Sequence, residues 1–462
     1  MIKKILIASV SICFFACSYK QSISKKTPVK NMTTTTFKKA GWIHNTNVYE
    51  VNLRQYTKEG TLNAFAKELP RLKEMGVEVL WFMPLTPISQ QNKKGSLGSY
   101  YACSDYTAVN SEFGNLDDVK NLVRTAHGMG FKVIIDWVAN HTGWDHVWTK
   151  SHPGYYEKDT ITGTFKIASG MDDIIELDFT NTELRKAMIS AMKFWVTECD
   201  IDGFRCDLAF WVELDFWLEA RAELEKIKTL FWLAENDPLE HPEYGKAFDA
   251  AYTWSWMHKT EEFYKKDPDI KILDSVLLKY DATAKNGSGI NLWFTTNHDE
   301  NSWNGTEYEK YGDMALALAV FSFTWDGIPL IYGGQELPNK KRLQFFEKDP
   351  IEWNGKYELD NFYKTLNNLR KTNKALSAGD NDVSTYRLRI DADKNVLAYV
   401  RKNGGDEVLV LLNLSKDVAR FEIQNNIISG KYVNVFDKSN NDFTDSKLFD
   451  MQPWEYRVYE KR

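Results

Sequence analysis

The chain has 462 residues, a formal net charge of -6 and a pI near 5.9. A slightly acidic chain with no long Lys/Arg block outside its N-terminal region is not typical of nucleic-acid binding proteins. Its 43% hydrophobic and 26% charged residues indicate a globular chain, long enough for one large domain and a smaller one. The 16 Trp, 22 Tyr and 26 Phe make carbohydrate the first ligand class to test, because aromatic rings stack on the apolar faces of sugars.

Residues 1–17 have the features of a bacterial export signal. Lys3 and Lys4 precede an apolar run at 5–16 that is too short to span a membrane. The ending at 14–17 resembles a lipobox, in which Cys17 is lipidated after cleavage, and Cys13 is a poorer candidate. A plain cleaved signal peptide is the alternative. We therefore expect an exported protein of the cell envelope, anchored by lipid on the periplasmic or outer-membrane face.

A polar stretch follows at 18–40, and its Ser, Thr and Lys content predicts a flexible tether outside the fold. Without Cys13 and Cys17, three cysteines remain, namely Cys103, Cys199 and Cys206. At most one disulfide can form among them, and their spacing is not that of metal ligands.

From Gly41 onward, short apolar strands alternate with amphipathic helices. Strands are predicted at 48–52, 77–83, 132–138, 202–206, 231–234, 248–254, 292–296 and 329–332, and helices at 62–75, 116–129, 181–198, 211–227 and 314–323. Regular alternation predicts a parallel sheet, and eight units predict closure into a TIM (β/α)8 barrel over 41–375. The rival is an open doubly wound sheet, but no glycine-rich phosphate turn follows the first strand.

Two segments depart from this rhythm. Gly, Pro and Tyr interrupt it at 142–178, which predicts a short inserted subdomain after the third strand. At 376–462 the pattern changes to alternating strands, such as 386–390, 396–401 and 407–412, separated by Asp, Asn and Gly turns. This predicts a C-terminal all-β domain, expected to be a β-sandwich.

Charged side chains gather where the predicted barrel strands end. The pentapeptide 203–207 places Arg205 two residues before Asp207, so that both side chains leave the strand on one face and the Arg keeps the carboxylate ionised. Such a carboxylate suits nucleophilic attack on an anomeric carbon. The third, fifth and seventh strands end near Asp136 and His141, at Glu235, and at His298 and Asp299. Barrel enzymes carry their chemistry at this rim, and crowded acids shift one another's pKa.

These residues resemble the α-amylase family, glycoside hydrolase family thirteen, over nearly everything from Gly41 to the C-terminus. Four stretches are similar to its motifs: 136–141, 203–207, Glu235 and 298–299. Two more stretches are similar to further family motifs, at 101–106, where a Tyr stands four residues before an Asp-Tyr pair, and at 327–336 in the eighth strand.

The resemblance implies three catalytic carboxylates. Asp207 is expected to be the nucleophile, Glu235 the general acid and base, and Asp299 a carboxylate that binds sugar hydroxyls and stabilises the transition state. Two carboxyls placed for covalent catalysis imply retention of the α-configuration, with water as the final acceptor.

The resemblance also implies substrate-binding roles. Arg205 is expected to position Asp207, and His141 and His298 to hydrogen-bond the sugar on the non-reducing side of the cleaved bond. Tyr101 is expected to stack beneath that sugar, and Asp136 to support the site from the third strand.

The sequence departs from the family pattern in three places. Many α-amylases have a Lys-His pair after the nucleophile, but here residues 208–211 read Leu-Ala-Phe-Trp. The subsites that bind the leaving part of the substrate must therefore be built differently. Trp211 either contributes to these subsites or is buried in the core. In family members that have it, this His also provides a backbone ligand to a structural calcium ion. Asn140 is a candidate for another ligand of that ion. Calcium is therefore possible, but no cofactor is expected to be required. The specificity stretch 174–179 does not resemble the signatures of α-amylases, neopullulanases or oligo-1,6-glucosidases, which leaves the linkage preference open.

The main functional prediction is hydrolysis of α-1,4-glucosidic bonds in starch-type glucans or malto-oligosaccharides. An exo-acting α-glucosidase or a transglycosylase on the same scaffold is the alternative among enzymes. A non-catalytic glycan-binding lipoprotein is the alternative from another class, and the intact set of Asp207, Glu235 and Asp299 argues against it. The expected partner is an α-glucan, with no nucleic acid and with membrane contact only through the lipid anchor.

Overall fold

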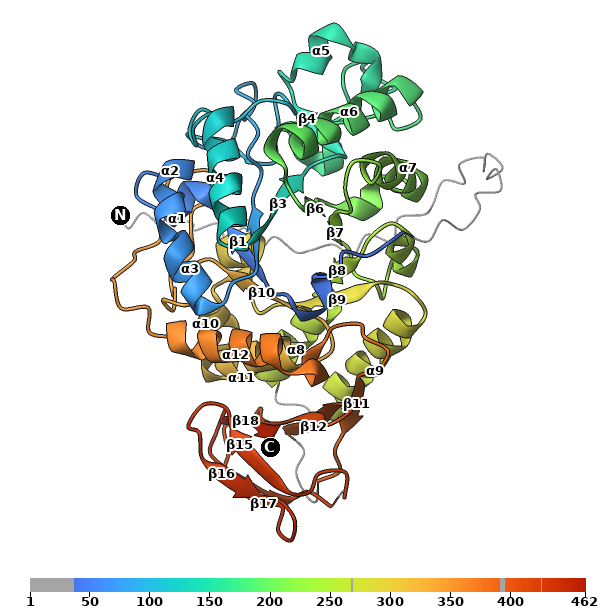
Figure 1. Ribbon diagram of the computed structural model, residues 1–462. Coiled ribbons are helices and arrows are strands. Elements are labelled where there is room, and N and C mark those ends of the chain that lie inside the picture. Colours follow the sequence, from blue (N-terminus) through green and yellow to red (C-terminus); the bar gives the residue numbers. More distant parts are fainter. Residues whose placement is uncertain (1–36, 267–268, 391–394, 425) are drawn as a thin grey trace, which may run out of the picture. The chain divides into compact units, whose positions relative to one another are not determined.

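The computed structural model describes residues 37–266, 269–390, 395–424 and 426–462 (Figure 1). The predicted export signal, the lipobox cysteine Cys17 and residues 18–36 of the predicted tether lie outside these ranges. Two residues of the predicted tether contact the fold: Ala40 is buried in the core, and the Arg221 guanidinium lies 4.8 Å from the Phe37 ring centroid. The predicted tether is therefore wrong for Phe37 and Ala40, whose apolar side chains find partners on the barrel, while Lys38 and Lys39 between them are exposed.

Eight parallel strands close into a barrel in the order β1-β10-β9-β8-β7-β6-β3-β2 (Figure 1). β1 pairs with both β10 and β2, which completes the closure. The strands are β1 (Val48–Val51), β2 (Val79–Phe82), β3 (Lys132–Trp137), β6 (Gly203–Cys206), β7 (Phe231–Ala234), β8 (Ala250–Tyr252), β9 (Ile290–Trp293) and β10 (Ile328–Tyr332). The predicted TIM barrel is confirmed, and the open sheet is excluded.

Helices surround the barrel in the described part of the chain. They are α1 (Leu53–Tyr56), α2 (Leu62–Phe65), α3 (Leu69–Met75), α4 (Leu116–Gly128), α6 (Thr182–Cys199), α7 (Leu214–Leu224), α8 (Trp254–Lys266), α9 (Lys271–Lys285), α10 (Glu307–Tyr311), α11 (Ala315–Thr324) and α12 (Asp360–Thr372). The single helix predicted at 62–75 is divided by a 3-10 turn at Ala66–Glu68, and Pro70 stands at the start of α3, where its missing N–H costs no helical hydrogen bond. α8, α9 and α12 were not predicted.

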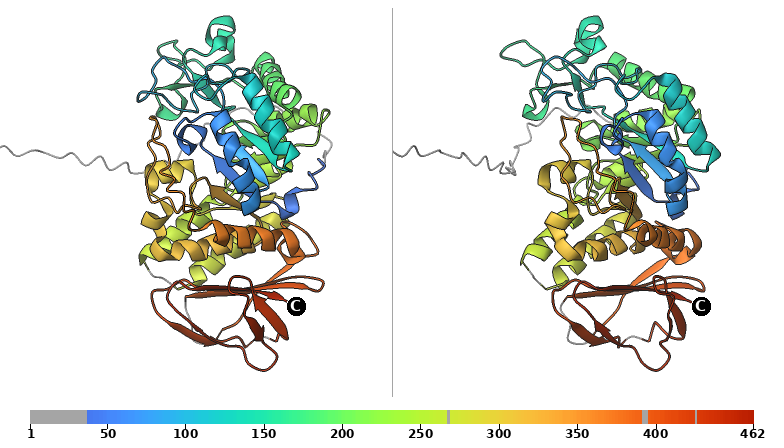
Figure 2. Two further views of the ribbon diagram at one scale, coloured as in Figure 1. Left: turned by 60° about the vertical axis from the view of Figure 1, so that its left-hand side comes forward. Right: turned by 90° about the vertical axis from the view of Figure 1, so that its left-hand side faces the viewer.

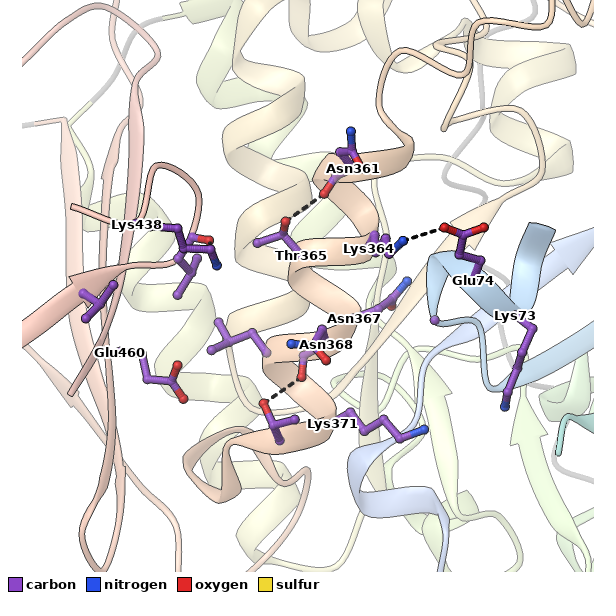
Figure 3. A pocket seen from close by; sticks show the side chains of 15 residues that line it. Lys73, Glu74, Asn361, Lys364, Thr365, Asn367, Asn368, Lys371, Lys438 and Glu460 are labelled. Atoms are coloured by element: carbon purple, nitrogen blue, oxygen red, sulfur yellow. Dashed lines mark hydrogen bonds and ion pairs between the residues drawn. The ribbon is translucent and has the colours of Figure 1, made fainter. Parts of the chain in front are cut away.

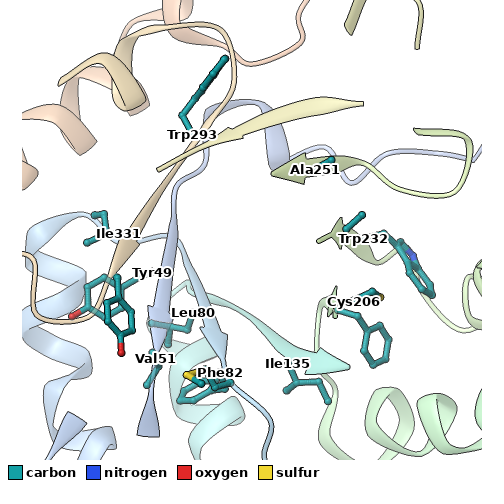
Figure 4. Packing of buried hydrophobic residues seen from close by; sticks show 14 of the residues in the cluster. Tyr49, Val51, Leu80, Phe82, Ile135, Cys206, Trp232, Ala251, Trp293 and Ile331 are labelled. Carbon is teal, nitrogen blue, oxygen red and sulfur yellow. The ribbon is translucent and has the colours of Figure 1, made fainter. Parts of the chain in front are cut away.

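Strand side chains alternate between two apolar layers, as the period of 2 requires. Residues such as Val51, Leu80, Ile135 and Trp232 pack outward against the helices (Figure 4). Their neighbours along the strands fill the barrel interior: Val48, Val79, Ile134, Phe231, Leu233, Ala250, Ile290, Leu292, Ile328 and Leu330. The interior is thus a packed core.

The predicted insert forms a small subdomain between β3 and α6. It contains an antiparallel pair, β4 (His141–Gly143) with β5 (Ile174–Glu176), and the short helix α5 (Val147–Ser151). Tyr156, Ile175 and Leu177 are buried in the main core, which ties the insert to the barrel.

The C-terminal strands form a six-stranded sheet in the order β11-β12-β13-β18-β15-β16 and a separate pair, β14 with β17 (Figure 2). They are β11 (Ser384–Arg387), β12 (Val396–Asn403), β13 (Asp406–Asn413), β14 (Ala419–Glu422), β15 (Lys431–Asn434), β16 (Asn440–Asp442), β17 (Leu448–Met451) and β18 (Tyr456–Lys461). Tyr399 packs on Trp325 at 4.8 Å, and Arg401 pairs with Asp326 at 3.2 Å. The predicted all-β character is confirmed.

Cys103, Cys199 and Cys206 are buried free thiols. No helix within the described ranges has the length and apolar character needed to cross a membrane.

Candidate active site

The candidate residues continue the inward-facing series of the barrel strands beyond the apolar core. Asp136 follows Ile134 by two residues in β3, and Glu235 follows Leu233 by two residues at the end of β7. Arg205 and Asp207 occupy the corresponding positions of β6. Because alternate residues share one face, these four side chains converge on the carboxyl end of the barrel, as predicted.

Arg205 lies at the centre of this group and is fully buried. Its Nη1 lies 3.0 Å from an Asp136 oxygen and 3.1 Å from an Asp207 oxygen, and its Nη2 lies 2.9 Å from a Glu235 oxygen. One planar guanidinium therefore holds three carboxyl groups from three adjacent strands, and it places Asp207 and Glu235 on neighbouring nitrogens.

Two features of the barrel make room for this guanidinium. It lies 5.0 Å from the centroid of the Trp81 ring and 5.5 Å from that of Tyr252, which shield it from solvent through their electron-rich faces. At the start of the same strand, a Cβ on Gly203 would lie 2.0 Å from the backbone oxygen of Phe231. Only glycine permits β6 and β7 to approach this closely.

His298 and Tyr101 form a second group beside the first. The Tyr101 ring stacks on His298 at 5.4 Å and 17°, and its hydroxyl lies 2.6 Å from His298 Nε2. The same hydroxyl donates to Asp136 at 3.1 Å, which joins the two groups. Asp299 Oδ2 lies 3.4 Å from His298 Nε2.

Glu50 in β1 is a site residue that the sequence reasoning missed. Its Oε1 lies 2.5 Å from His298 Nδ1, and both side chains are buried. A signal was present, because Glu50 is the one charged residue in the apolar strand Val48–Val51. A buried charge in such a strand needs a partner, but the sequence does not say which.

Opposing effects set the protonation of His298. Burial lowers its pKa, but the charges of Asp299 and Glu50 and the hydrogen bond to Glu50 outweigh burial and raise the pKa to about 9. Near neutral pH the ring is therefore a cation with a proton on each nitrogen.

Asp136 and Asp207, two of the carboxyl groups around Arg205, hold protons more strongly than isolated carboxyls. Burial, opposed by Arg205, raises the pKa of Asp136 to about 6. Burial and the charge of Glu235 raise the pKa of Asp207 well above its usual value, while Arg205 opposes the rise. The pKa of Asp299 is also raised by burial, although its side chain is 37% exposed and solvent screens part of the effect.

The prediction that Arg205 keeps Asp207 ionised is therefore incomplete. The ion pair exists, but the crowded acids and the loss of water act against it and dominate in the free protein. The protons belong to the cluster as a whole rather than to single residues.

His141 lies at the start of the insert and is buried. Burial lowers its pKa to about 4, so the ring is neutral, and its Nε2 has no hydrogen-bond partner among the described residues. Tyr106 fixes the loop that carries this ring, because its hydroxyl donates to the backbone oxygens of Val138 and His141 at 2.7 and 3.1 Å.

The segment after Asp207 turns sharply past Glu235. Leu208 has a left-handed backbone with φ of 40°, and its N–H donates to Glu235 at 2.9 Å. Phe210 stacks on His241 at 4.7 Å and 14°, while Trp211 is half-buried. This segment therefore presents aromatic rings beside Glu235, where the family pattern has Lys and His.

Asn140, the candidate calcium ligand, and Asp178, near the end of the insert, both have partners within the protein. Asp178 Oδ1 accepts from both the backbone N–H and the hydroxyl of Thr180, and the Asn140 amide nitrogen faces His141 at 3.4 Å. Across the described ranges, no group of three or more His, Cys, Asp or Glu side chains is placed to hold a metal ion.

A pocket of about 550 Å³ lies elsewhere, between α3, α12 and the C-terminal strands (Figure 3). Its lining includes Lys73, Lys371, Lys438 and Glu460, and Lys364 pairs with Glu74 at 2.8 Å. It contains none of the candidate residues and no aromatic ring, so it lacks the stacking surface that a sugar site requires.

Comparison with known proteins decides the family. The family model for the α-amylase catalytic domain matches two overlapping segments, 15–162 and 155–375, and the model for the α-amylase C-terminal all-β domain matches 387–456. The chain belongs to the α-amylase family. It is an α-amylase-type glycoside hydrolase, as the resemblance predicted.

Relatives in the α-amylase family are distant in sequence but cover most of this chain. Alpha-amylase 3 of Dictyoglomus thermophilum is 24% identical over 455 residues, which cover 84% of this chain and 88% of that protein. A cyclomaltodextrinase of Thermoanaerobacter pseudethanolicus is 25% identical over 77% of this chain and 64% of its own length. The structure of a maltogenic alpha-amylase from Thermotoga neapolitana is similar with a TM-score of 0.82 and 28% identity, over 90% of this chain and 98% of that one.

Proposed function

We propose that this enzyme cleaves α-1,4-glucosidic bonds in starch-type glucans or malto-oligosaccharides with retention of configuration. The observation that carries the proposal is the pair of carboxyl groups, Asp207 and Glu235, on neighbouring nitrogens of Arg205. Retaining glycosidases need two carboxyls close together, because one attacks the sugar directly and no water must fit between them.

In the first step, the cluster's shared proton lies on Glu235, and the ionised Asp207 carboxylate attacks the anomeric carbon while the bond to the leaving oxygen breaks. Glu235 gives its proton to that oxygen, which leaves as the free hydroxyl of the product. In the second step, water gives a proton to Glu235 and its oxygen displaces Asp207 from the sugar. Two displacements at one carbon restore the original configuration.

The surrounding residues bind and orient the sugar in this proposal. Tyr101 offers a ring to its apolar face, and Asp299 accepts from its hydroxyls. The ring of His141 is neutral and the Asn140 amide nitrogen, a donor, faces its Nδ1 at 3.4 Å, so the proton lies on the unpartnered Nε2, which can donate to a further hydroxyl. Arg205 and the His298 cation balance part of the negative charge of the cluster.

The names of relatives support the substrate class. Proteins named alpha-amylase, cyclomaltodextrinase and neopullulanase match most of this chain at 24 to 26% identity. The test is a time course on starch and on maltotriose with products separated by chain length. Early products in the α-configuration, observed by NMR, support the proposal. Early β-products overturn retention, and absence of cleavage overturns the enzyme assignment for these substrates.

Glu50→Gln is expected to move the alkaline limit of activity to lower pH. The Glu50 charge raises the pKa of His298, so its removal lowers that pKa. His298 is protonated below its pKa and loses its charge above it. The alkaline limb of kcat/KM should therefore shift down by about 1 to 2 pH units. Pre-steady-state and steady-state rates across pH 5 to 10 measure this shift.

Glu74→Gln provides the matched control for that variant. Glu74 is an exposed residue paired with Lys364 at 2.8 Å, far from His298, and its replacement should leave the pH profile unchanged. An alkaline limb that stays in place in Glu50→Gln, with normal folding, would show that Glu50 is a packing residue and not a positioning residue for His298.

Activity is expected to be independent of added calcium. The insert is held by the β4–β5 pair and by buried Tyr156 and Leu177, so an ion has little left to organise. After dialysis against a chelator, melting temperature and turnover should match those of the undialysed enzyme. A fall of many degrees that calcium alone reverses would contradict this expectation.

Export and lipid anchoring at Cys17 remain proposals from the sequence. Fractionation of cells that express the Cys17→Ser variant tests them, since an anchored protein should leave the membrane fraction when the lipidated sulfur is removed.

A further inference from the structure

Trp303 lies just outside the catalytic rim and is 52% exposed. It is the most exposed tryptophan in the described part of the chain. It belongs to the π-helical turn Glu300–Asn304, which begins one residue after Asp299. A single exposed apolar side chain is common on protein surfaces, but this ring continues a group of aromatic rings that reaches the site, and such a group is typical of a binding surface.

Aromatic rings connect Trp303 to the site without interruption. The Tyr101 ring, which stacks on His298, is also nearly parallel to the Phe345 ring, with an angle of 17° between the planes and 6.2 Å between the centroids. Phe345 in turn lies 5.2 Å from Trp303, and Phe346 lies 5.7 Å from it. The rings form a surface that starts at the sugar-binding Tyr101 and ends at the exposed Trp303.

Hydrogen bonds hold this surface in place. The Asn301 side chain donates to the backbone oxygen of Lys341 at 3.1 Å and accepts from the N–H of Leu343 at 2.9 Å. Gln55 in α1 donates to the backbone oxygen of Gln344 at 2.7 Å. The turn that carries Trp303 and the segment that carries Phe345 are therefore fixed to each other before a ligand arrives, which reduces the entropy cost of binding.

The position of Glu235 decides which part of the substrate meets this surface. The proton donor must lie beside the leaving oxygen, and Glu235 contacts the Leu208 N–H in the segment after β6. Tyr101 contacts Asp136 and His298, so in the proposed reaction the sugar that becomes bound to Asp207 sits against Tyr101. Units beyond that sugar, toward the non-reducing end, lie away from Glu235, and the rings that continue from Tyr101 are Phe345 at 6.2 Å and then Trp303.

We propose that Trp303 is a stacking platform for a glucosyl unit on the non-reducing side, beyond the unit that Tyr101 contacts. The inference rests on the proposed α-glucan hydrolysis and adds to it a preference for substrates with several units on that side. Such a platform favours long substrates, because a glucosyl unit that stacks on it adds binding free energy, and a substrate with a single glucosyl unit does not extend to it.

The test compares a long with a short substrate. The kcat/KM for 4-nitrophenyl α-maltoheptaoside is divided by the kcat/KM for 4-nitrophenyl α-glucoside. The single glucosyl unit of the second substrate fills only the position above Tyr101. In Trp303→Ala this ratio should fall about tenfold, the loss expected for one aromatic stacking contact. In Trp303→Phe most of the ratio should remain. The ratio of the affinity for maltoheptaose to the affinity for maltose, measured by calorimetry in Glu235→Gln enzyme, should fall by a similar factor when Trp303→Ala is added.

Tyr386→Ala is the matched control, because it removes a ring that is 41% exposed on β11 of the C-terminal domain and should leave the ratio unchanged. A ratio in Trp303→Ala within twofold of the wild type, or an equal loss on both substrates, would overturn the platform while the proposed hydrolysis stands. A wild-type enzyme that cleaves and binds neither glycan would overturn the proposed function and the platform together.

Discussion

Asp207→Ala is expected to reduce kcat by roughly 10⁴-fold or more on every glycoside, because the covalent step has no other nucleophile. Asp207 is 6% exposed and its Oδ1 pairs with Arg205 at 3.1 Å. The fold should survive, since Arg205 keeps ion pairs with Asp136 and Glu235. Turnover on maltoheptaose and far-UV circular dichroism measure the two expectations separately.

Azide gives this variant a specific readout. The space left by the carboxylate admits the anion, which can attack an activated aryl α-glycoside from the face that Asp207 occupied and form a β-glycosyl azide. Asp117→Ala, at an exposed position in the first turn of α4, is the control and should keep full activity. An Asp207→Ala enzyme that retains a tenth of wild-type turnover would assign the nucleophile to another residue.

Glu235→Gln is expected to lose more activity on substrates whose leaving oxygen must be protonated than on substrates whose leaving group departs as an anion. With unactivated maltoheptaose the first step should slow by about 10³-fold, because the leaving oxygen must be protonated. With a 2,4-dinitrophenyl glycoside, whose anion leaves unaided, the loss of that step should be roughly tenfold or less. Single-turnover rates of aglycone release on both substrates measure the difference.

The smaller variant Glu235→Ala separates this role from that of Asp207. Its glycosyl-enzyme still forms on Asp207, so azide should displace the carboxylate and give an α-glycosyl azide, opposite in configuration to the product of Asp207→Ala. Glu74→Gln, at an exposed residue paired with Lys364, is the matched control and should keep full activity on both substrates. Equal losses of Glu235→Gln on good and poor leaving groups would remove Glu235 from the acid role.

Several features of the site could be predicted from sequence because they depend on neighbours along the chain. Strand alternation places Arg205 and Asp207 on one face, and the end of each strand marks the rim. The structure confirms the barrel, the convergence of the strand ends and the Arg205–Asp207 pair. The catalytic roles of these residues remain proposals.

Other features depend on contacts between distant segments. Glu50 and His298 are 248 positions apart, and only closure of β1 against β10 brings the two side chains together. The protonation of Asp207 likewise depends on burial and on Glu235, which comes from a different strand. No local pattern reports the distance between two strands that meet only in the closed barrel.

The sequence by itself therefore determined the eight strands and most of the long helices, because these follow from periods of 2 and 3.6 residues. It also determined the residue types at the rim, and it was through the motifs there that the chain resembled its family. Only the tertiary structure decided the sharing of Arg205 by three carboxyl groups, the cationic state of His298 beside Glu50, and the aromatic surface from Tyr101 to Trp303. The physical reason is that electrostatic and stacking interactions depend on distance in space and on desolvation, which the closed barrel creates.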